Sequence, residues 1–132
     1  VLFTGDVVEQ GADPAFDDSF PDMWVQVLQT VAGLDRYRVF VPGHGLPVER
    51  TFVQRQAETM REAINRIEAS AANPLAGPTT AAMYKLPYEA GVTRVLLDRL
   101  EWLKSQGLTG DALVAEETPE GATGPITRGE QV

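Results

Sequence analysis

Near the start of the chain, the spacing of apolar positions changes from strand-like to helical and back. Residues 1–8 are apolar and β-branched around a Thr-Gly-Asp break, and residues 37–41 form a second such run that Pro42-Gly43 stops. The apolar stripe between them recurs at helical spacing and consists of Trp24, Val27, Leu28, Val31 and Leu34. This order favours a right-handed βαβ unit in which both strands are parallel.

Residues around that stripe predict where its helix begins and ends. Ser19 is the expected N-cap, because its hydroxyl can accept a hydrogen bond from the first turn, and Pro21 suits that turn. Gly33 is expected to end the helix. Residues 9–19 are rich in turn formers and predict a loop.

The rest of the chain predicts helices and a tail. Residues 51–72 carry the longest helical pattern, with an apolar face of Val53, Ala57, Met60, Ile64, Ile67 and Ala71. A weak helix is predicted over residues 80–86. A strong one is predicted over residues 92–106, with Gly107 as its cap and an apolar side of Val92, Val95, Leu96, Leu100 and Leu103. From about Glu116 onward the composition predicts disorder. We therefore expect three parts: residues 1–50, a helical extension over 51–107 and a flexible acidic tail over 108–132.

Composition and charge narrow the classes of function. With 132 residues and 43% hydrophobic content, the chain has the size of one globular domain. It has no cysteine, which excludes disulfides, Cys-ligated zinc and a thiol nucleophile. The net charge is −8, and residues 1–22 contain no Lys or Arg, so neither nucleic acid nor an anionic membrane is an expected partner. No apolar run reaches the ~18 residues of a membrane span, and the cellular compartment stays open.

Asp6 and His44, the only histidine, follow the two predicted strands directly. Parallel strands bring their carboxyl ends to one sheet edge, so we expect the two side chains to be neighbours. Carboxylate oxygens and imidazole nitrogens both bind zinc, manganese and iron. Taken singly, Asp6 could be a turn residue and His44 a surface residue in a Pro-Gly turn. Their joint placement favours a metal site.

With these motifs in place, residues 1–45 resemble the C-terminal part of a metallo-β-lactamase-fold hydrolase domain. In that family, a strand ending in Gly-Asp supplies a carboxylate that bridges two metal ions, and a later strand ending in Pro-Gly-His-Gly supplies the last histidine. Thr4-Gly5-Asp6 and Pro42-Gly43-His44-Gly45 match both motifs in order and spacing. The resemblance implies that Asp6 and His44 are catalytic metal ligands of a centre with two Zn²⁺ ions, with Mn or Fe as other possibilities.

The resemblance also implies what lies outside these residues. The family's His-x-His-x-Asp-His signature and a further histidine precede the Gly-Asp strand, and neither occurs here. We therefore expect a fragment of a longer α/β protein: the C-terminal half of an αββα sandwich, followed by a helical extension. Half a sandwich leaves one sheet face uncovered. The implied activity is hydrolysis of an ester, thioester, lactam or related bond of a small-molecule substrate by a metal-bound hydroxide. The helical extension could also pack a homodimer.

Other functions receive less support. A Ser-His-Asp triad with Ser19 or Ser70 lacks the Gly-x-Ser-x-Gly elbow, and Ser70 falls within a predicted helix. Residues 84–88 could line a substrate pocket, although packing between helices is the commoner role of such a cluster. The main competing hypothesis is a non-catalytic α/β and helical interaction module in which Asp6 and His44 are turn residues.

Overall fold

The structure, a computed structural model, describes residues 1–72 and 86–108. Within them the chain forms a mixed α/β fold with a three-stranded sheet and three helices. The elements in chain order are β1 (Leu2–Gly5), α1 (Pro21–Ala32), β2 (Val39–Pro42), β3 (Val48–Glu49), α2 (Arg50–Ala72) and α4 (Ala90–Ser105). The predicted tail and nearly all of the weak helix at 80–86 lie outside the described residues.

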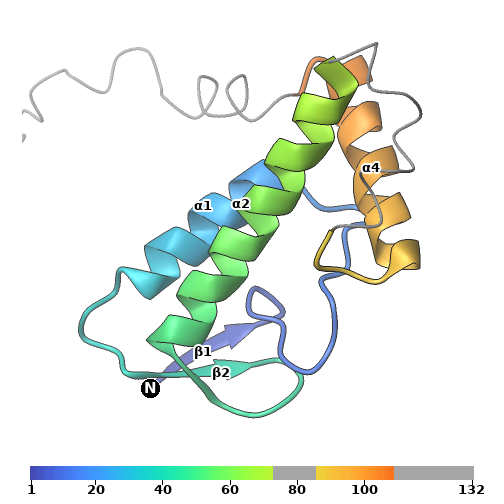
Figure 1. Cartoon of the computed structure of the whole chain (residues 1–132). Coiled ribbons are helices and arrows are strands. Elements are labelled where there is room, and N and C mark those ends of the chain that lie inside the picture. Colours follow the sequence, from blue (N-terminus) through green and yellow to red (C-terminus); the bar gives the residue numbers. More distant parts are fainter. Residues whose placement is uncertain (73–85, 109–132) are drawn as a thin grey trace, which may run out of the picture.

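The sheet has the strand order β1-β2-β3, and its first pair is parallel as the sequence predicts. Leu2 pairs with Phe40 and Phe3 with Val41, and an irregularity then brings Gly5 opposite Pro42. In Figure 1 the arrows of β1 and β2 point the same way, so their carboxyl ends lie together. β3 pairs antiparallel with β2 and is absent from the prediction, because a strand of two residues has no readable period.

The helices cover one side of the sheet (Figure 1). A single hydrophobic core joins the sheet to all three helices, so residues on both sides of position 50 contribute to it. Its fully buried members include Val25 and Leu28 of α1, Phe40 of β2, Val53, Met60 and Ile64 of α2, and Leu96 of α4. The predicted helical extension therefore shares its core with residues 1–50.

One prediction for α1 is wrong: its N-cap is Phe20 without a side-chain hydrogen bond, and the Ser19 hydroxyl donates instead to the carbonyl of Phe16. The predicted stripe is right in part, because Leu28 is buried and Trp24 and Val31 pack partly buried against the core. Val27 is 42% exposed and Leu34 lies beyond the helix, whereas Pro21, Val25 and Ala32 are buried. The buried face of α1 is difficult to predict from the sequence, because apolar residues also occupy the outer face of this helix. Gly33 ends the helix as predicted.

The other two helices follow their predicted patterns closely. In α2, every residue of the predicted face is buried except Ala71, which lies in the exposed last turn. In α4, Leu96 and Leu103 are buried and the other predicted residues are half-buried. Gly107 follows this helix at φ +71°, and its N–H donates to the carbonyl of Lys104. A left-handed glycine at this position is a common helix stop.

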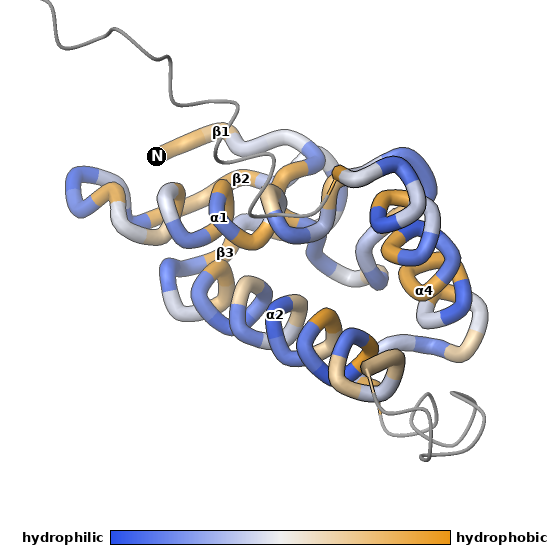
Figure 2. Tube along the Cα trace, turned by 90° about the horizontal axis from the view of Figure 1, so that it is seen from above, coloured by the Kyte–Doolittle hydropathy of each residue, from blue (hydrophilic) through white to orange (hydrophobic). Residues whose placement is uncertain are grey.

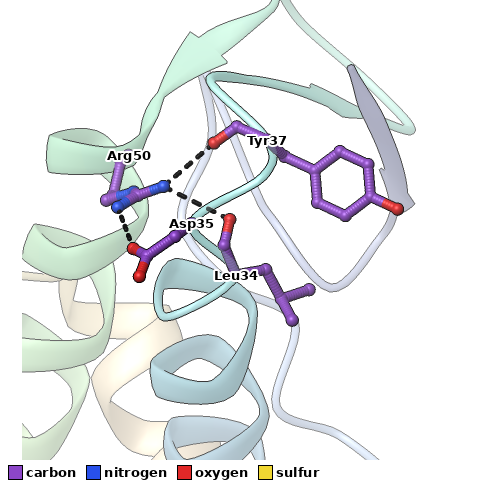
Figure 3. Close-up of polar contacts among 4 residues, drawn as sticks. All are labelled: Leu34, Asp35, Tyr37 and Arg50. Carbon is purple, nitrogen blue, oxygen red and sulfur yellow. Dashed lines mark hydrogen bonds and ion pairs between the residues drawn. The ribbon is translucent and has the colours of Figure 1, made fainter.

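Arg50, the first residue of α2, ties together the connection between α1 and β2 (Figure 3). Its guanidinium donates to Oδ1 of Asp35 at 2.7 Å and to the carbonyls of Leu34 at 3.2 Å and Tyr37 at 3.0 Å. One side chain thus satisfies backbone carbonyls just after α1 and just before β2. This places the start of β2 relative to α2.

The sheet face opposite the helices is apolar and open. Phe3 is 80% exposed, Val1 68% and Val39 37%, whereas their strand neighbours Leu2 and Phe40 turn toward the core. Figure 2 shows hydrophobic colour along β1 at the margin of the molecule. Soluble proteins rarely leave such a face uncovered, so this surface is suited to further contact.

Candidate metal centre

Asp6 and His44 lie side by side at the carboxyl ends of β1 and β2. Nδ1 of His44 is 3.2 Å from Oδ1 of Asp6, and the side chains are 80% and 72% exposed respectively. The predicted proximity of the two residues is confirmed. Both groups face solvent, where a ligand can reach them.

Backbone contacts hold the two strand ends together beyond the sheet. The N–H of Gly43 donates to the carbonyl of Gly5 at 2.9 Å, and the N–H of Val7 closes a turn onto Thr4 at 3.3 Å. Gly5 has φ +53°, a left-handed conformation that β-branched residues rarely adopt. The chain can therefore turn at once after β1 and deliver Asp6 toward the second loop.

The two glycines that flank His44 make room for side chains from the Asp6 loop. A Cβ at Gly43 would lie 2.2 Å from Oδ1 of Asp6. A Cβ at Gly45 would lie 2.1 Å from Oε1 of Gln10 and 2.6 Å from its backbone oxygen. The Pro-Gly-His-Gly motif thus has a packing reason in this chain: its glycines let the two loops touch.

Three further hydrogen bonds position the loop that carries Asp6. Nε1 of Trp24 in α1 donates to the carbonyl of Val7 at 2.8 Å. The N–H of Glu9 donates to Oε1 of Gln56 in α2 at 3.3 Å, and Oε1 of Gln10 accepts from the N–H of Leu46 at 2.8 Å. Sequence patterns do not indicate the roles of Gln10 and Gln56, because a single glutamine in a loop or on a helix has no characteristic spacing.

Glu9 adds a third ionisable group to this region. Burial raises the pKa of the Glu9 carboxyl above its ordinary value, and the Asp6 carboxylate raises it further. His44 acts on this pKa in the opposite direction. Glu9 therefore senses the charges of both candidate ligands, which the sequence pattern did not indicate.

The Asp6–His44 pair combines a carboxylate and an imidazole, two groups that bind zinc. Its separation of 3.2 Å is that of a direct ion pair or hydrogen bond, and two donors of one zinc ion would lie about 3.3 Å apart. Two donors do not complete a site. Among residues 1–72 and 86–108, no group of three or more His, Cys, Asp or Glu side chains is placed to hold a metal ion.

The structure gives the other candidate residues structural roles. The Ser19 hydroxyl bonds to the Phe16 carbonyl, and Ser70 lies inside α2 as expected. The ring of Tyr88 packs 5.5 Å from that of Phe16, and burial raises the pKa of its phenol, with a further increase from Asp13. Tyr88 is therefore a packing residue, whereas Tyr84 and Lys85 lie outside the described residues.

No family model, curated protein or solved structure matches this sequence. A further observation concerns membranes: no helix in the described part of the chain combines the length and apolar composition needed to cross a bilayer.

Proposed function

We propose that this chain is the C-terminal part of a metal-dependent hydrolase of the metallo-β-lactamase superfamily. The observation that carries the proposal is the 3.2 Å contact between Asp6 and His44, which joins the ends of two adjacent parallel strands. Each residue also lies in the sequence motif that the family uses for a ligand at this place.

The open face of the sheet supports the same proposal. Phe3 and Val41 are register partners on that face, and Phe3 is 80% exposed. An αββα sandwich packs a second sheet against a surface of this kind. The first half of the domain would supply that sheet together with the remaining metal ligands.

In the proposed site, Asp6 and His44 hold metal, with Zn²⁺ as the expected ion and Mn or Fe as other candidates. A zinc ion bound there would supply a water molecule of lowered pKa and polarise the bond to be hydrolysed. Asp6 would hold the metal through its carboxylate oxygens, and His44 would hold it through a ring nitrogen. The turn at Gly5 and the contact of Gly43 with Asp6 keep both donors at the open edge of the sheet. The proposed substrate is a small molecule with an ester, thioester, lactam or related bond.

A second candidate is a non-catalytic interaction module. It is favoured by the exposed apolar face of the sheet, where Phe3 is 80% exposed and could contact a partner. In that case the Asp6–His44 contact would be an exposed polar pair and the apolar face of the sheet would receive another protein. A homodimer through residues 51–107 stays a prediction under either function.

The coding sequence upstream of Val1 separates the two candidates. The hydrolase requires a His-x-His-x-Asp-His run in the same reading frame, within about one domain length. A frame that lacks this run would contradict the enzyme and leave the interaction module.

Activity of the full-length protein provides the second test. We expect zinc-dependent hydrolysis of at least one of an aryl ester, an acyl thioester and a β-lactam. Asp6→Ala and His44→Ala should each abolish it, whereas Asp17→Ala makes the same change as Asp6→Ala at another exposed position and should retain it. Normal turnover in either of the first two variants would overturn the assignment.

A further inference from the structure

Gln10 joins the loop that carries Asp6 to the loop that carries His44. It follows Asp6 by one short turn, and its Oε1 accepts a hydrogen bond of 2.8 Å from the N–H of Leu46. Leu46 lies two positions after His44. The bond therefore connects the two loops just beyond the proposed ligands.

The second loop also packs directly against Gln10. Gly45 has φ +90°, and a Cβ there would lie 2.1 Å from Oε1 of Gln10 and 2.6 Å from its backbone oxygen. The approach is so close that only a glycine fits. The position of Gly45 and Leu46 thus depends on where Gln10 lies.

Gln10 is itself held by the helical layer. The N–H of Glu9, its neighbour, donates to Gln56 of α2, and the carbonyl of Val7 accepts from Trp24 of α1. These contacts fix the backbone from which the Gln10 side chain extends. A path of hydrogen bonds therefore runs from two helices through Gln10 to the backbone next to His44.

We propose that Gln10 is a positioning residue that holds residues 43–46 so that His44 stays within reach of Asp6. Its effect on metal binding rests on the proposed function, whereas its effect on the loop does not. Residues that orient metal ligands affect metal affinity about 10- to 100-fold when they are changed. In this proposal, Gln10 acts on His44 through the backbone of the loop that carries His44. The role involves no contact between Gln10 and substrate.

The test compares Gln10→Met with Gln10→Glu in the full-length protein. Methionine has a similar length but no oxygen, whereas glutamate keeps an acceptor at the same place. Gln26→Met makes the same chemical change at an exposed position of α1 and serves as the control. Amide exchange at Leu46 and the dissociation constant for zinc are measured for each variant, with the melting temperature in the presence of a chelator as a measure of global stability.

We expect Gln10→Met to speed exchange at Leu46 about two- to tenfold, the range that one hydrogen bond provides. Its zinc affinity should fall about 10- to 100-fold with the melting temperature near that of the wild type. Gln10→Glu should keep the protection of Leu46, and Gln26→Met should leave exchange at Leu46 and zinc affinity unchanged.

Unchanged exchange at Leu46 in Gln10→Met would overturn the positioning role, whatever happens to zinc. A large fall in melting temperature for this variant would also overturn it, because Gln10 would then be a general stability residue. If the wild-type protein binds no zinc, the proposed function fails, and faster exchange at Leu46 would still support the link between the loops. The two failures are therefore distinguishable.

Discussion

Gly43 leaves the space that the Asp6 carboxylate occupies, because a Cβ at position 43 would lie 2.2 Å from Oδ1 of Asp6. The loop that carries Asp6 and the loop that carries His44 are therefore in close contact, which their sequence motifs do not indicate. The glycine before His44 leaves room for the carboxylate of Asp6, which follows the neighbouring strand β1.

Gly43→Ala should therefore weaken metal binding. The φ of Gly43 is not positive, so alanine fits the backbone, and the Asp6 carboxylate must move away from the new methyl group. We expect zinc affinity of the full-length protein to fall at least about tenfold, as measured by titration against a chelator.

Gly91→Ala is the matched control for this change. A Cβ at Gly91, near the start of α4, meets no atom within 4 Å. Alanine should raise stability there by about 0.5–1 kcal/mol, with zinc affinity unchanged. Equal zinc affinities for Gly43→Ala and the wild type would show that Asp6 does not need its observed position.

The ion pair between Asp22 and Arg61 should stabilise the packing of α1 on α2. Oδ1 of Asp22 is 2.6 Å from the Arg61 guanidinium, and the side chains are only 20% and 34% exposed. We expect a coupling free energy of about 1 kcal/mol from a double-mutant cycle with alanine at both positions. The exposed pair Arg94–Asp98 within α4 should give less than about 0.5 kcal/mol. Similar values for the two pairs would argue against the importance of partial burial.

Phe3 tests whether a second sheet covers the open face. In the full-length hydrolase that we propose, Phe3 would be buried, and Phe3→Ala should cost about 3–5 kcal/mol of unfolding free energy. Val27→Ala, at a partly exposed position of α1 in the helical layer, should cost less than about 1 kcal/mol. Denaturant unfolding measures both. A cost for Phe3→Ala as small as that for Val27→Ala would mean that nothing packs on this face.

Glu9 should make stability depend on pH. Burial and the Asp6 carboxylate raise the pKa of Glu9 above its ordinary value of 4.5, so the folded state holds this proton more tightly than the unfolded state. The resulting stabilisation is fully present below about pH 4.5 and is lost as the pH rises through the folded-state pKa. Relative to Glu9→Gln, the wild type should therefore lose unfolding free energy between pH 4 and pH 7.

The Glu9 measurement is made with a chelator present, because bound metal would change the charge at Asp6 and His44. Glu58→Gln, the same change at an exposed position of α2, provides the comparison. A difference between wild type and Glu9→Gln that stays constant or grows with pH would contradict the burial of Glu9.

The order of the longer elements was predictable from the local spacing of apolar residues, whereas the two-residue strand β3 was not. The runs around Phe3 and Phe40 are short and β-branched, and the face from Val53 to Ile67 repeats at helical spacing over the length of α2. The helix cap was not predictable in the same way. Ser19 has the right chemistry, but its hydroxyl bonds to Phe16, and this choice depends on the path of the preceding loop.

The candidate site likewise contains residues that the sequence predicts and residues that it does not. Asp6 and His44 were found because short motifs and parallel strands bring them together, and the observed contact agrees. The supporting residues Gln10, Gln56 and Trp24 act through backbone groups of distant segments. Such contacts depend on the three-dimensional packing of loops on helices, for which a single sequence contains no periodic signal.

The most direct test of the central claim is the zinc content of the purified full-length protein by elemental analysis, for the wild type, Asp6→Ala and His44→Ala. We expect about two ions per chain in the wild type and a loss of metal in both variants, because Asp6 is proposed to serve two ions and His44 one. Asp17→Ala should keep the wild-type content. Zinc content that is unchanged in Asp6→Ala and His44→Ala, or absent from the wild type, would contradict the account.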